Sequence, residues 1–445
     1  MNTYIYSNEH IGSMALADLE EWNPWWRDGK VPSDLAGRSR QLTERVIELL
    51  EQPEIVNLVG VRRSGKSTIM YQVVDRLLSS GTPPQNVMMV NFEDPALDGD
   101  SLGSMLSEHR QRYAPKGMTY VLLDEVQRSK GWERWVLREY ERKKPFRFLV
   151  SGSTTHVIRG ELATLLTGRT RTVRAFPLTF PEYLEFQDRP LDGFSGTELR
   201  DLALHHLGNY LEVGGFPRAV LSAPSSRRGL LDDYFHDIIT RDVARVHGVD
   251  LTDVEALAAH ILANVGNLMS LRSMGEAVSL APNTVKAYIE HLAAAYLVVP
   301  VDHLSFKTKP KVQEQAPSKY FCIDTGLRNA VSKRHSADSG RLLENAVCVE
   351  LVRRGAKVHY WKGRQEVDLV VGVPPGPFTP MNVSFGDVVP DREYNGLEEI
   401  RQTLKRGIGR PALLSKVEPT PRDWVDNYLV WKWLLEPVEP NDSAR

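Results

Sequence analysis

The segment "NLVGVRRSGKSTIM", residues 57–70, determines what kind of protein this sequence encodes. It carries the pattern Gly-x-x-x-x-Gly-Lys-Ser behind the apolar run "EIVNLVGV" (54–61), and a helix-length segment ending near Gly81 follows it. In such a loop, glycines let the backbone wrap around a phosphate, and the N–H groups at the start of the next helix point at its oxygens. A strand before the loop and a helix after it are the context that this motif requires. The segment therefore predicts a P-loop that binds ATP and Mg²⁺.

Each side chain of the loop has an expected task. Lys66 reaches the β- and γ-phosphates, and the hydroxyl of Ser67 binds Mg²⁺. The residues that we expect around the nucleotide are Gly60, Arg63, Ser64, Gly65, Lys66, Ser67 and Thr68.

A second strand, "TYVLLDEVQ" (119–127), ends in two acids. Asp124 is placed to coordinate Mg²⁺, and Glu125 to activate the attacking water, as the catalytic residue of hydrolysis. A solvated strand end is the alternative reading, but adjacent carboxylates after an apolar run are poor core residues, because unpaired buried charge is costly.

Hydroxyl groups and arginines further along the chain are candidates to complete the site. Ser151, at the end of "FRFLVSGS" (146–153), is our choice to sense the γ-phosphate, with Ser153 as a helix N-cap or a second candidate. Arg169 is the candidate arginine finger, which would act on a neighbouring subunit's nucleotide, and Arg171 is the second choice. The alternative is a solvated basic face. Arg218, in "VGGFPRAV", could contact the γ-phosphate from a lid or pair with local backbone.

Apolar runs at 54–61, 86–94, 119–127, 146–153 and 171–178 alternate with helix-length segments. This alternation predicts a parallel sheet with helices on both faces. Residues 1–36 contain three tryptophans in "EWNPWWRDG", for which we expect an aromatic clasp onto the next domain, with a nucleobase or subunit contact as the alternative.

Composition narrows the setting of the protein. The formal net charge of −2 and the isoelectric point near 6.7 do not indicate a general nucleic-acid binder, so any basic surface must be local. Cys322 and Cys348 lie in apolar segments and are expected to be buried free thiols. No apolar run approaches the roughly 18 residues of a membrane span. We therefore expect a cytoplasmic protein with no membrane partner.

With these residues assembled, the chain resembles the AAA+ ATPases, and more narrowly a prokaryotic family in which the ATPase precedes a C-terminal domain of unknown function. The matching segments are, in order, "NPWW", "GVRRSGKST", "NFEDP", "LLDEVQ", "SGS", "LTGRT…FPLTFPEY", "GGFP", "RDVARVHG", "KYFCIDTGL" and "LLENAVCVELVRRG…VDLVV". The resemblance implies ATP binding and hydrolysis, a ring-like, hexamer-like homo-oligomer, a winged helix and a degenerate nuclease-like fold.

The expected fold class is α/β, a P-loop NTPase with a parallel sheet and a helical lid, followed by an all-α winged-helix domain and an α+β nuclease-like domain. The expected parts are an N-terminal segment (1–36), the AAA+ core (37–180), the helical lid (181–240), the winged helix–turn–helix (241–315) and a degenerate restriction-nuclease-like domain (316–445).

Two regions of the C-terminal half are candidates for partner binding. The second helix of "SLRSMGEAVSLAPNTVKAYIEHL" offers side chains at its exposed start, and the next segment carries lysines on one face of a wing. The expected DNA contacts are Asn283, Thr284, Lys286, Lys307, Lys309 and Lys311, with Tyr288 as a further contact. Protein binding is the alternative, since the fold serves both.

In the last domain, Glu344, Glu366 and Asp368 stand where the acids of a PD-(D/E)xK nuclease would bind a metal. Such a site also needs an acid-x-Lys pattern on the next strand, but "PMNVSFGD" has Asn382 and Ser384 there. This departure argues against nuclease activity.

The sequence thus leaves two main functional hypotheses. The first is an oligomeric ATP-driven motor or remodeller that acts on DNA, with branched or forked DNA as the guess at substrate. The second is a slow, nucleotide-gated switch or scaffold whose C-terminal half binds proteins.

Overall fold

The computed structural model describes residues 19–97, 102–152, 168–304, 316–332, 339–373, 376–404 and 407–436. The chain divides into two compact units: unit 1 is Met1–Val61 with Gly65–Ala175, and unit 2 is Arg62–Ser64 with Phe176–Arg445. Within the described ranges, no helix is long and apolar enough to cross a membrane.

Unit 1 contains a five-stranded, all-parallel sheet in the order β2-β3-β4-β1-β5. Its strands are β1 (Ile55–Val59), β2 (Val87–Asn91), β3 (Thr119–Asp124), β4 (Phe146–Gly152) and β5 (Thr170–Arg174). Its α-helices are α2 (Trp25–Asp28), α3 (Ser33–Ala36), α4 (Leu42–Leu50), α5 (Lys66–Ser79), α6 (Leu102–Tyr113) and α7 (Trp132–Glu141), with the short 3-10 helices η1 (Pro84–Asn86), η2 (Pro95–Leu97) and η3 (Val126–Arg128).

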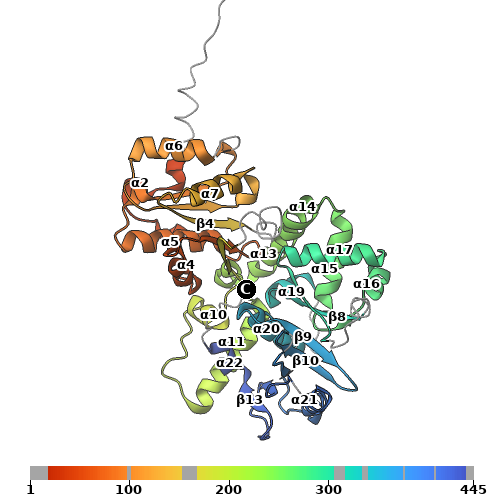
Figure 1. The fold of residues 1–445 in the computed structure, drawn as a ribbon. Coiled ribbons are helices and arrows are strands. Elements are labelled where there is room, and N and C mark those ends of the chain that lie inside the picture. The colour runs from red at the N-terminus through yellow and green to blue at the C-terminus, as the bar shows by residue number, and fades with distance from the viewer. Residues whose placement is uncertain are drawn as a thin grey trace, which may run out of the picture. The chain divides into compact units, whose positions relative to one another are not determined.

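The central strands of this sheet are buried on both faces. All five residues of β1 are buried, and α4 and α5 lie on one face of the sheet while α6 and α7 lie on the other (Figure 1). Continuous apolar strands covered by helices on both sides are typical of parallel sheets. The predicted P-loop NTPase fold is confirmed.

The tryptophan-rich segment covers the free edge of β2. Asn23 donates from Nδ2 to the Met89 carbonyl (2.7 Å) and accepts from the Met89 N–H (2.6 Å), as a neighbouring strand would. The indole N–H groups of Trp25 and Trp26 both donate to the Val87 carbonyl, at 2.9 and 2.8 Å. Because an open sheet edge exposes unpaired backbone groups, this segment acts as a clasp that satisfies them.

Unit 2 combines helices with two smaller sheets. Its helices are α10 (Phe180–Phe186), α11 (Gly196–Val213), α12 (Pro217–Leu221), α13 (Pro224–Asp237), the π-helix η4 (Ile238–Ala244), α14 (Arg245–His247), α15 (Leu251–Ala263), α16 (Leu271–Val278), α17 (Pro282–Ala294), α19 (Thr325–Val331), α20 (Ser339–Arg353), α21 (Asp391–Leu404) and α22 (Val430–Leu435). Its strands are β6 (Leu268–Met269), β7 (Val298–Val301), β8 (Ser318–Cys322), β9 (Val358–Lys362), β10 (Glu366–Val371), β11 (Thr379–Ser384), β12 (Ala412–Ser415) and β13 (Asp426–Leu429).

Helices α16 and α17 form a helix–turn–helix. Ser270 caps α16 by accepting from the Ser273 N–H at 3.0 Å, and Ser279, in the left-handed region at φ 59°, ends it. An antiparallel sheet in the order β6-β8-β7 completes this part. That sheet runs across the boundary that we expected at 315/316; the other expected boundaries stay predictions.

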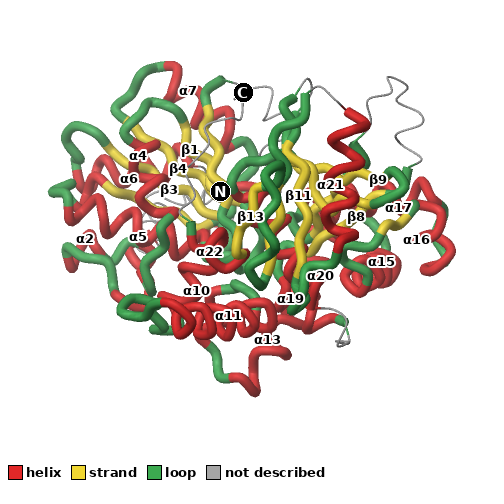
Figure 2. Tube along the Cα trace, turned by 90° about the horizontal axis from the view of Figure 1, so that it is seen from below, coloured by secondary structure: helices red, strands yellow, loops and turns green. Residues whose placement is uncertain are grey.

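The second sheet has the order β13-β12-β11-β10-β9 and mixed strand directions. It carries α20 and α21 on its opposite faces (Figure 2). Leu343 and Val347 of α20 belong to the same apolar cluster as Leu369 of β10. Leu397 of α21 belongs to a second cluster, with Val370, the next residue of that strand. Adjacent strand residues point to opposite faces, so both faces of this sheet are apolar. Both cysteines are buried free thiols, as expected.

Candidate functional site

Two glycines shape the loop that follows β1. Gly60 has φ 151°, and a Cβ atom there would lie 2.1 Å from the carbonyl oxygen of Ala175. Gly65 has φ 95° and stands directly before α5. The backbone therefore turns where only glycine fits at Gly60, and α5 begins at Lys66 with its N-terminus at the loop.

The side chains of the loop differ in exposure. Lys66 is buried, and its ammonium donates to the carbonyl oxygens of Gly60 (3.0 Å) and Val61 (3.2 Å). Ser67 is exposed and Thr68 is half-buried. The Lys66 ammonium thus contacts the backbone of the loop in which we expect the phosphates to bind.

Asp124 connects three elements at the ends of parallel strands. Ser67 Oγ, on α5, donates to Asp124 Oδ2 at 2.6 Å, and Ser151 Oγ, on β4, donates to Asp124 Oδ1. The backbone N–H of Glu125 also donates to Oδ1, at 3.1 Å. We call Ser67, Asp124 and Ser151 the Asp124 centre. It forms because β1, β4 and β3 are neighbours and their carboxyl ends meet at one edge.

The Asp124 centre matches the ligand preference of Mg²⁺. Its donors are a carboxylate and hydroxyl oxygens, which are the hard ligands that this ion takes. Burial, and after it the Asp124 carboxylate, raise the pKa of Tyr71 to about 12, so this neighbouring phenol stays neutral. The residues present therefore fit the metal that the P-loop motif implies.

Glu125 is held in an unusual backbone conformation. Its φ and ψ are 52° and 43°, the left-handed region that costs a non-glycine residue about 1–3 kcal/mol. The side chain is 8% exposed and accepts a hydrogen bond from Gln127 Nε2 at Oε2. Such strain persists where the surroundings fix a residue, and it places this carboxylate directly after the Asp124 centre.

The structure does not bring Arg169 or Arg171 to the loop of unit 1. Arg169 pairs with Glu141 at 3.1 Å, and Arg171 with Glu54 at 3.5 Å. The Arg169 carbonyl accepts from the Ile55 N–H, at the start of β1, whereas the P-loop follows the end of that strand. Both arginines therefore lie at the opposite end of the sheet.

Arg62, which the sequence analysis did not select, forms a buried ion pair within unit 2. Its Nη2 lies 2.9 Å and its Nε 3.1 Å from the Asp242 carboxylate, and both side chains are under 10% exposed. Asp242 lies in the π-helix η4 and in "RDVARVHG", so two recognised segments, 180 residues apart, meet here.

Arg63 and Arg218, two of the expected nucleotide contacts, also lie in unit 2. Arg63 pairs with Asp237 at 3.1 Å and has its guanidinium 5.6 Å from the centre of the Tyr234 ring. Arg218 is exposed on α12. Burial raises the pKa of Tyr234, while Arg63 and Arg218 act to lower it, so the two arginines share this neighbour.

The expected DNA contacts are only partly described. Asn283 and Lys286 are exposed at the start of α17, and Thr284 is half-buried. Tyr288 is 8% exposed, so the expectation that it lies at the exposed end of α17 is wrong. Lys307, Lys309 and Lys311, like Ser153, lie outside the described residues.

The three acids of the C-terminal domain do meet, but around a residue that the sequence analysis missed. Lys319, on β8, is 1% exposed and contacts Glu344, Glu366 and Asp368. The available signal was a lysine inside the apolar run "SKYFCID".

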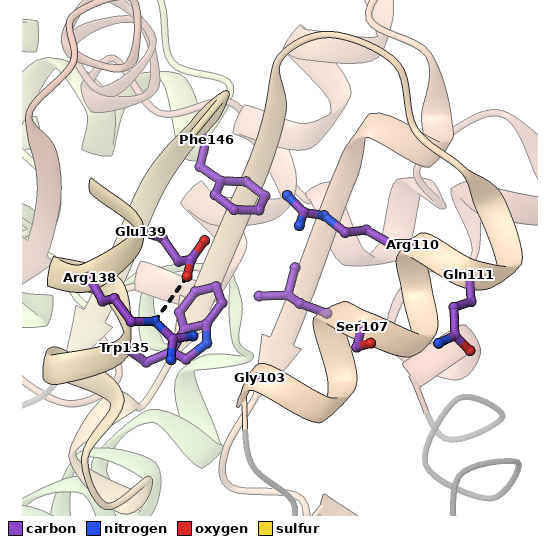
Figure 3. Close-up of a pocket in the computed structure, with 9 residues that line it drawn as sticks. Gly103, Ser107, Arg110, Gln111, Trp135, Arg138, Glu139 and Phe146 are labelled. Carbon is purple, nitrogen blue, oxygen red and sulfur yellow. Dashed lines mark hydrogen bonds and ion pairs between the residues drawn. The ribbon is translucent and has the colours of Figure 1, made fainter. Parts of the chain in front are cut away.

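A cavity of about 300 Å³ opens elsewhere in unit 1, between α6 and α7 (Figure 3). The Arg110 guanidinium lies 4.7 Å from the centre of the Phe146 ring, and Arg138 donates to Glu139 at 3.0 Å. Phe146 is the first residue of β4, so the cavity is at the strand ends opposite the P-loop. It is not part of the Asp124 centre.

Comparisons with known proteins show what this chain is similar to. Residues 52–184 match the family described as "AAA domain", and residues 204–338 match a family of domains of unknown function. An uncharacterized protein of Haemophilus influenzae is 27% identical over 405 residues, covering 88% of this chain and 97% of that protein. An uncharacterized protein of Methanocaldococcus jannaschii is 26% identical over 326 residues, covering 72% and 71%.

Two solved structures are similar to parts of this chain. The Aeropyrum pernix ORC1 protein in complex with DNA is 14% identical, with a TM-score of 0.33, covering 69% of this chain and 96% of its own. AMPPCP-bound DnaA from Aquifex aeolicus is 16% identical, with a TM-score of 0.29, covering 58% and 88%.

Replacing Gly60 tests the geometry of the loop. Gly60→Ala should destabilise the protein by about 1–3 kcal/mol more than Gly81→Ala, because both place alanine at positive φ but only the first drives Cβ into a backbone carbonyl. Urea unfolding of both variants measures the difference, and equal loss would contradict the described turn.

Proposed function

We propose that this chain, whose residues 52–184 are an AAA domain, hydrolyses ATP in a Mg²⁺-dependent reaction and works as an oligomer on DNA. The observation that carries the ATPase proposal is the Asp124 centre, which joins the first hydroxyl after the P-loop lysine to the acid at the end of β3. Two adjacent carboxylates at this edge would add little to the stability of the sheet, because burying unpaired charge costs free energy.

The residues of unit 1 divide the chemistry between them. Ser67 and Asp124 would hold Mg²⁺, which neutralises phosphate charge when bound, and Lys66 would donate to the phosphates. Glu125 accepts the proton of the attacking water, and the hydrogen bond from Gln127 orients its carboxylate. Ser151, which donates to Asp124, holds the metal-binding carboxylate in place. A direct hydrogen bond from Ser151 to the γ-phosphate remains part of the proposal.

Substitutions of Glu125 and Lys66 should affect different steps of the ATPase reaction. Glu125→Gln should bind ATP with near-normal affinity and lose at least about 100-fold in turnover, since a general base contributes that much. Lys66→Ala should weaken ATP binding itself. Fluorescent-nucleotide titration and phosphate release separate the two effects, with Glu133→Gln, in the first turn of α7, as the control. Wild-type turnover in Glu125→Gln would contradict the assigned role.

The place of Arg169 supports action between subunits. It lies at the end of the sheet opposite its own P-loop, where it cannot reach its own nucleotide. We propose that it supplies positive charge to a neighbour's transition state in a ring-like, hexamer-like assembly.

Mixing two inactive variants tests this arrangement. Arg169→Ala subunits keep an intact P-loop, and Lys66→Ala subunits keep the finger, so the mixture should regain part of the ATPase activity. Arg171→Ala, which removes a nearby arginine at the start of β5, should remain active alone. A mixture as inactive as its components would contradict an arginine finger at Arg169.

The DNA role is supported by the helix–turn–helix. Asn283 and Lys286 are exposed at the start of α17, where the second helix of a winged helix contacts bases or phosphates. The other proposed DNA contacts are Thr284 and lysines 307, 309 and 311. Arg218, near Tyr234, is the proposed nucleotide contact from α12. Branched or forked DNA is the proposed substrate class.

The second candidate is a nucleotide-gated switch that binds proteins. It is favoured by the charge balance on the same helices, where Arg272 pairs with Glu276 at 2.8 Å and Glu290 is exposed on α17. A surface of mixed charge suits a protein partner better than a polyanion.

DNA binding by a double variant separates the two candidates. Asn283→Ala with Lys286→Ala should weaken binding to forked DNA about tenfold and reduce its salt dependence by about one phosphate contact. Fluorescence anisotropy measures both, with Lys144→Ala in unit 1 as a control of equal charge change. DNA that binds both variants equally, and leaves ATP turnover unchanged, would favour the switch.

A further inference from the structure

A buried ammonium lies at the centre of the acid cluster of unit 2. Lys319 Nζ is 2.9 Å from Glu344 Oε1, 2.8 Å from Glu366 Oε1 and 3.7 Å from Asp368 Oδ1. The carboxylates come from α20 and β10, whereas the lysine comes from β8. We call these four residues the Lys319 cluster.

The positive charge of Lys319 is offset by the acids of the same cluster. Burial alone would lower the pKa of Lys319, but Glu344, Asp368 and Glu366 together raise it above its ordinary value, so the ammonium stays charged. Burial raises the pKa of Glu344 to about 8. On the outer side, Lys362 donates to Glu366 Oε2 at 3.3 Å. Two ammonium groups, of Lys319 and Lys362, therefore face the three carboxyl groups of the cluster.

Neighbouring backbone fixes the remaining acid. The Val383 N–H donates to Asp368 Oδ2 at 3.0 Å, and Asn382 Oδ1 accepts from the Asp368 N–H at 3.0 Å. Asn382 therefore occupies the strand beside Asp368 as a hydrogen-bond partner of its backbone.

This arrangement does not fit the divalent cation that a nuclease-like fold implies. A cation held by Glu344, Glu366 and Asp368 needs the oxygens that already surround Lys319 Nζ, and an ammonium at that point excludes it by both space and charge. Among the described residues, no group of three or more His, Cys, Asp and Glu side chains is arranged to hold a metal ion.

We propose that the Lys319 ammonium takes the place of a divalent cation, so that the Lys319 cluster is a closed ion-pair centre that joins the two sheets of unit 2. Lys319 belongs to the three-stranded sheet and Glu366 and Asp368 to the five-stranded sheet, so the cluster holds the helix–turn–helix part and the C-terminal part in one arrangement. The position where a nuclease-like fold would hold a metal thereby serves the assembly of unit 2.

Removing the lysine should convert the cluster into a cation site. Nucleotide-free full-length Lys319→Ala should bind about one Mn²⁺ more than wild type, measured by the loss of the free-ion signal in electron paramagnetic resonance. The double variant Lys319→Ala with Glu366→Gln should lose this gain. Lys362→Ala removes the same charge from the exposed side of Glu366 and should gain none. Mn²⁺ should also restore part of the melting temperature that Lys319→Ala loses.

The wild-type protein supplies a test that does not depend on how Lys319→Ala folds. Wild type and Glu366→Gln should bind equal Mn²⁺, because the cluster is closed. Mn²⁺ binding by wild type that Glu366→Gln abolishes would overturn the proposal. A folded Lys319→Ala, judged by circular dichroism, that gains no Mn²⁺ would overturn it as well.

Discussion

The candidate active site depends on the hydrogen bonds that the Asp124 carboxylate accepts from two hydroxyl groups. This carboxylate accepts from Ser67 at the start of α5 and from Ser151 at the end of β4, and it lies itself at the end of β3. The parallel order of the sheet makes this possible, since a parallel arrangement brings the carboxyl ends of its strands to one edge. A carboxylate buried to 1% exposure needs such donors, because an unpartnered buried charge is costly.

The same edge sets the position of the other functional groups. The Gly60 turn lies close against the backbone at Ala175, and α5 begins beyond it at Lys66, so that Ser67 lies beside Asp124. Glu125 follows in a strained conformation. Arg169, just before β5, and Arg171, on β5, lie at the end of the sheet opposite the P-loop.

Local patterns predicted the features that depend on neighbours in sequence. The P-loop, its strand and helix, and the acids after β3 follow from short-range spacing and apolar runs. The roles of Lys319 and Arg62 were not predicted, because their ion-pair partners lie 25 and 180 residues away in the sequence. Only the fold brings these partners close. Tyr288 was misjudged because periodicity alone did not show which side of α17 faces the core.

A structure of the chain with Mg²⁺ and a non-hydrolysable ATP analogue tests the central claim most directly. The account predicts Mg²⁺ at Ser67 and Asp124, directly or through water, and the Lys66 ammonium moved from the carbonyls of Gly60 and Val61 to the phosphates. Nucleotide bound elsewhere, or Lys66 still bonded to those two carbonyls beside a bound triphosphate, would contradict it.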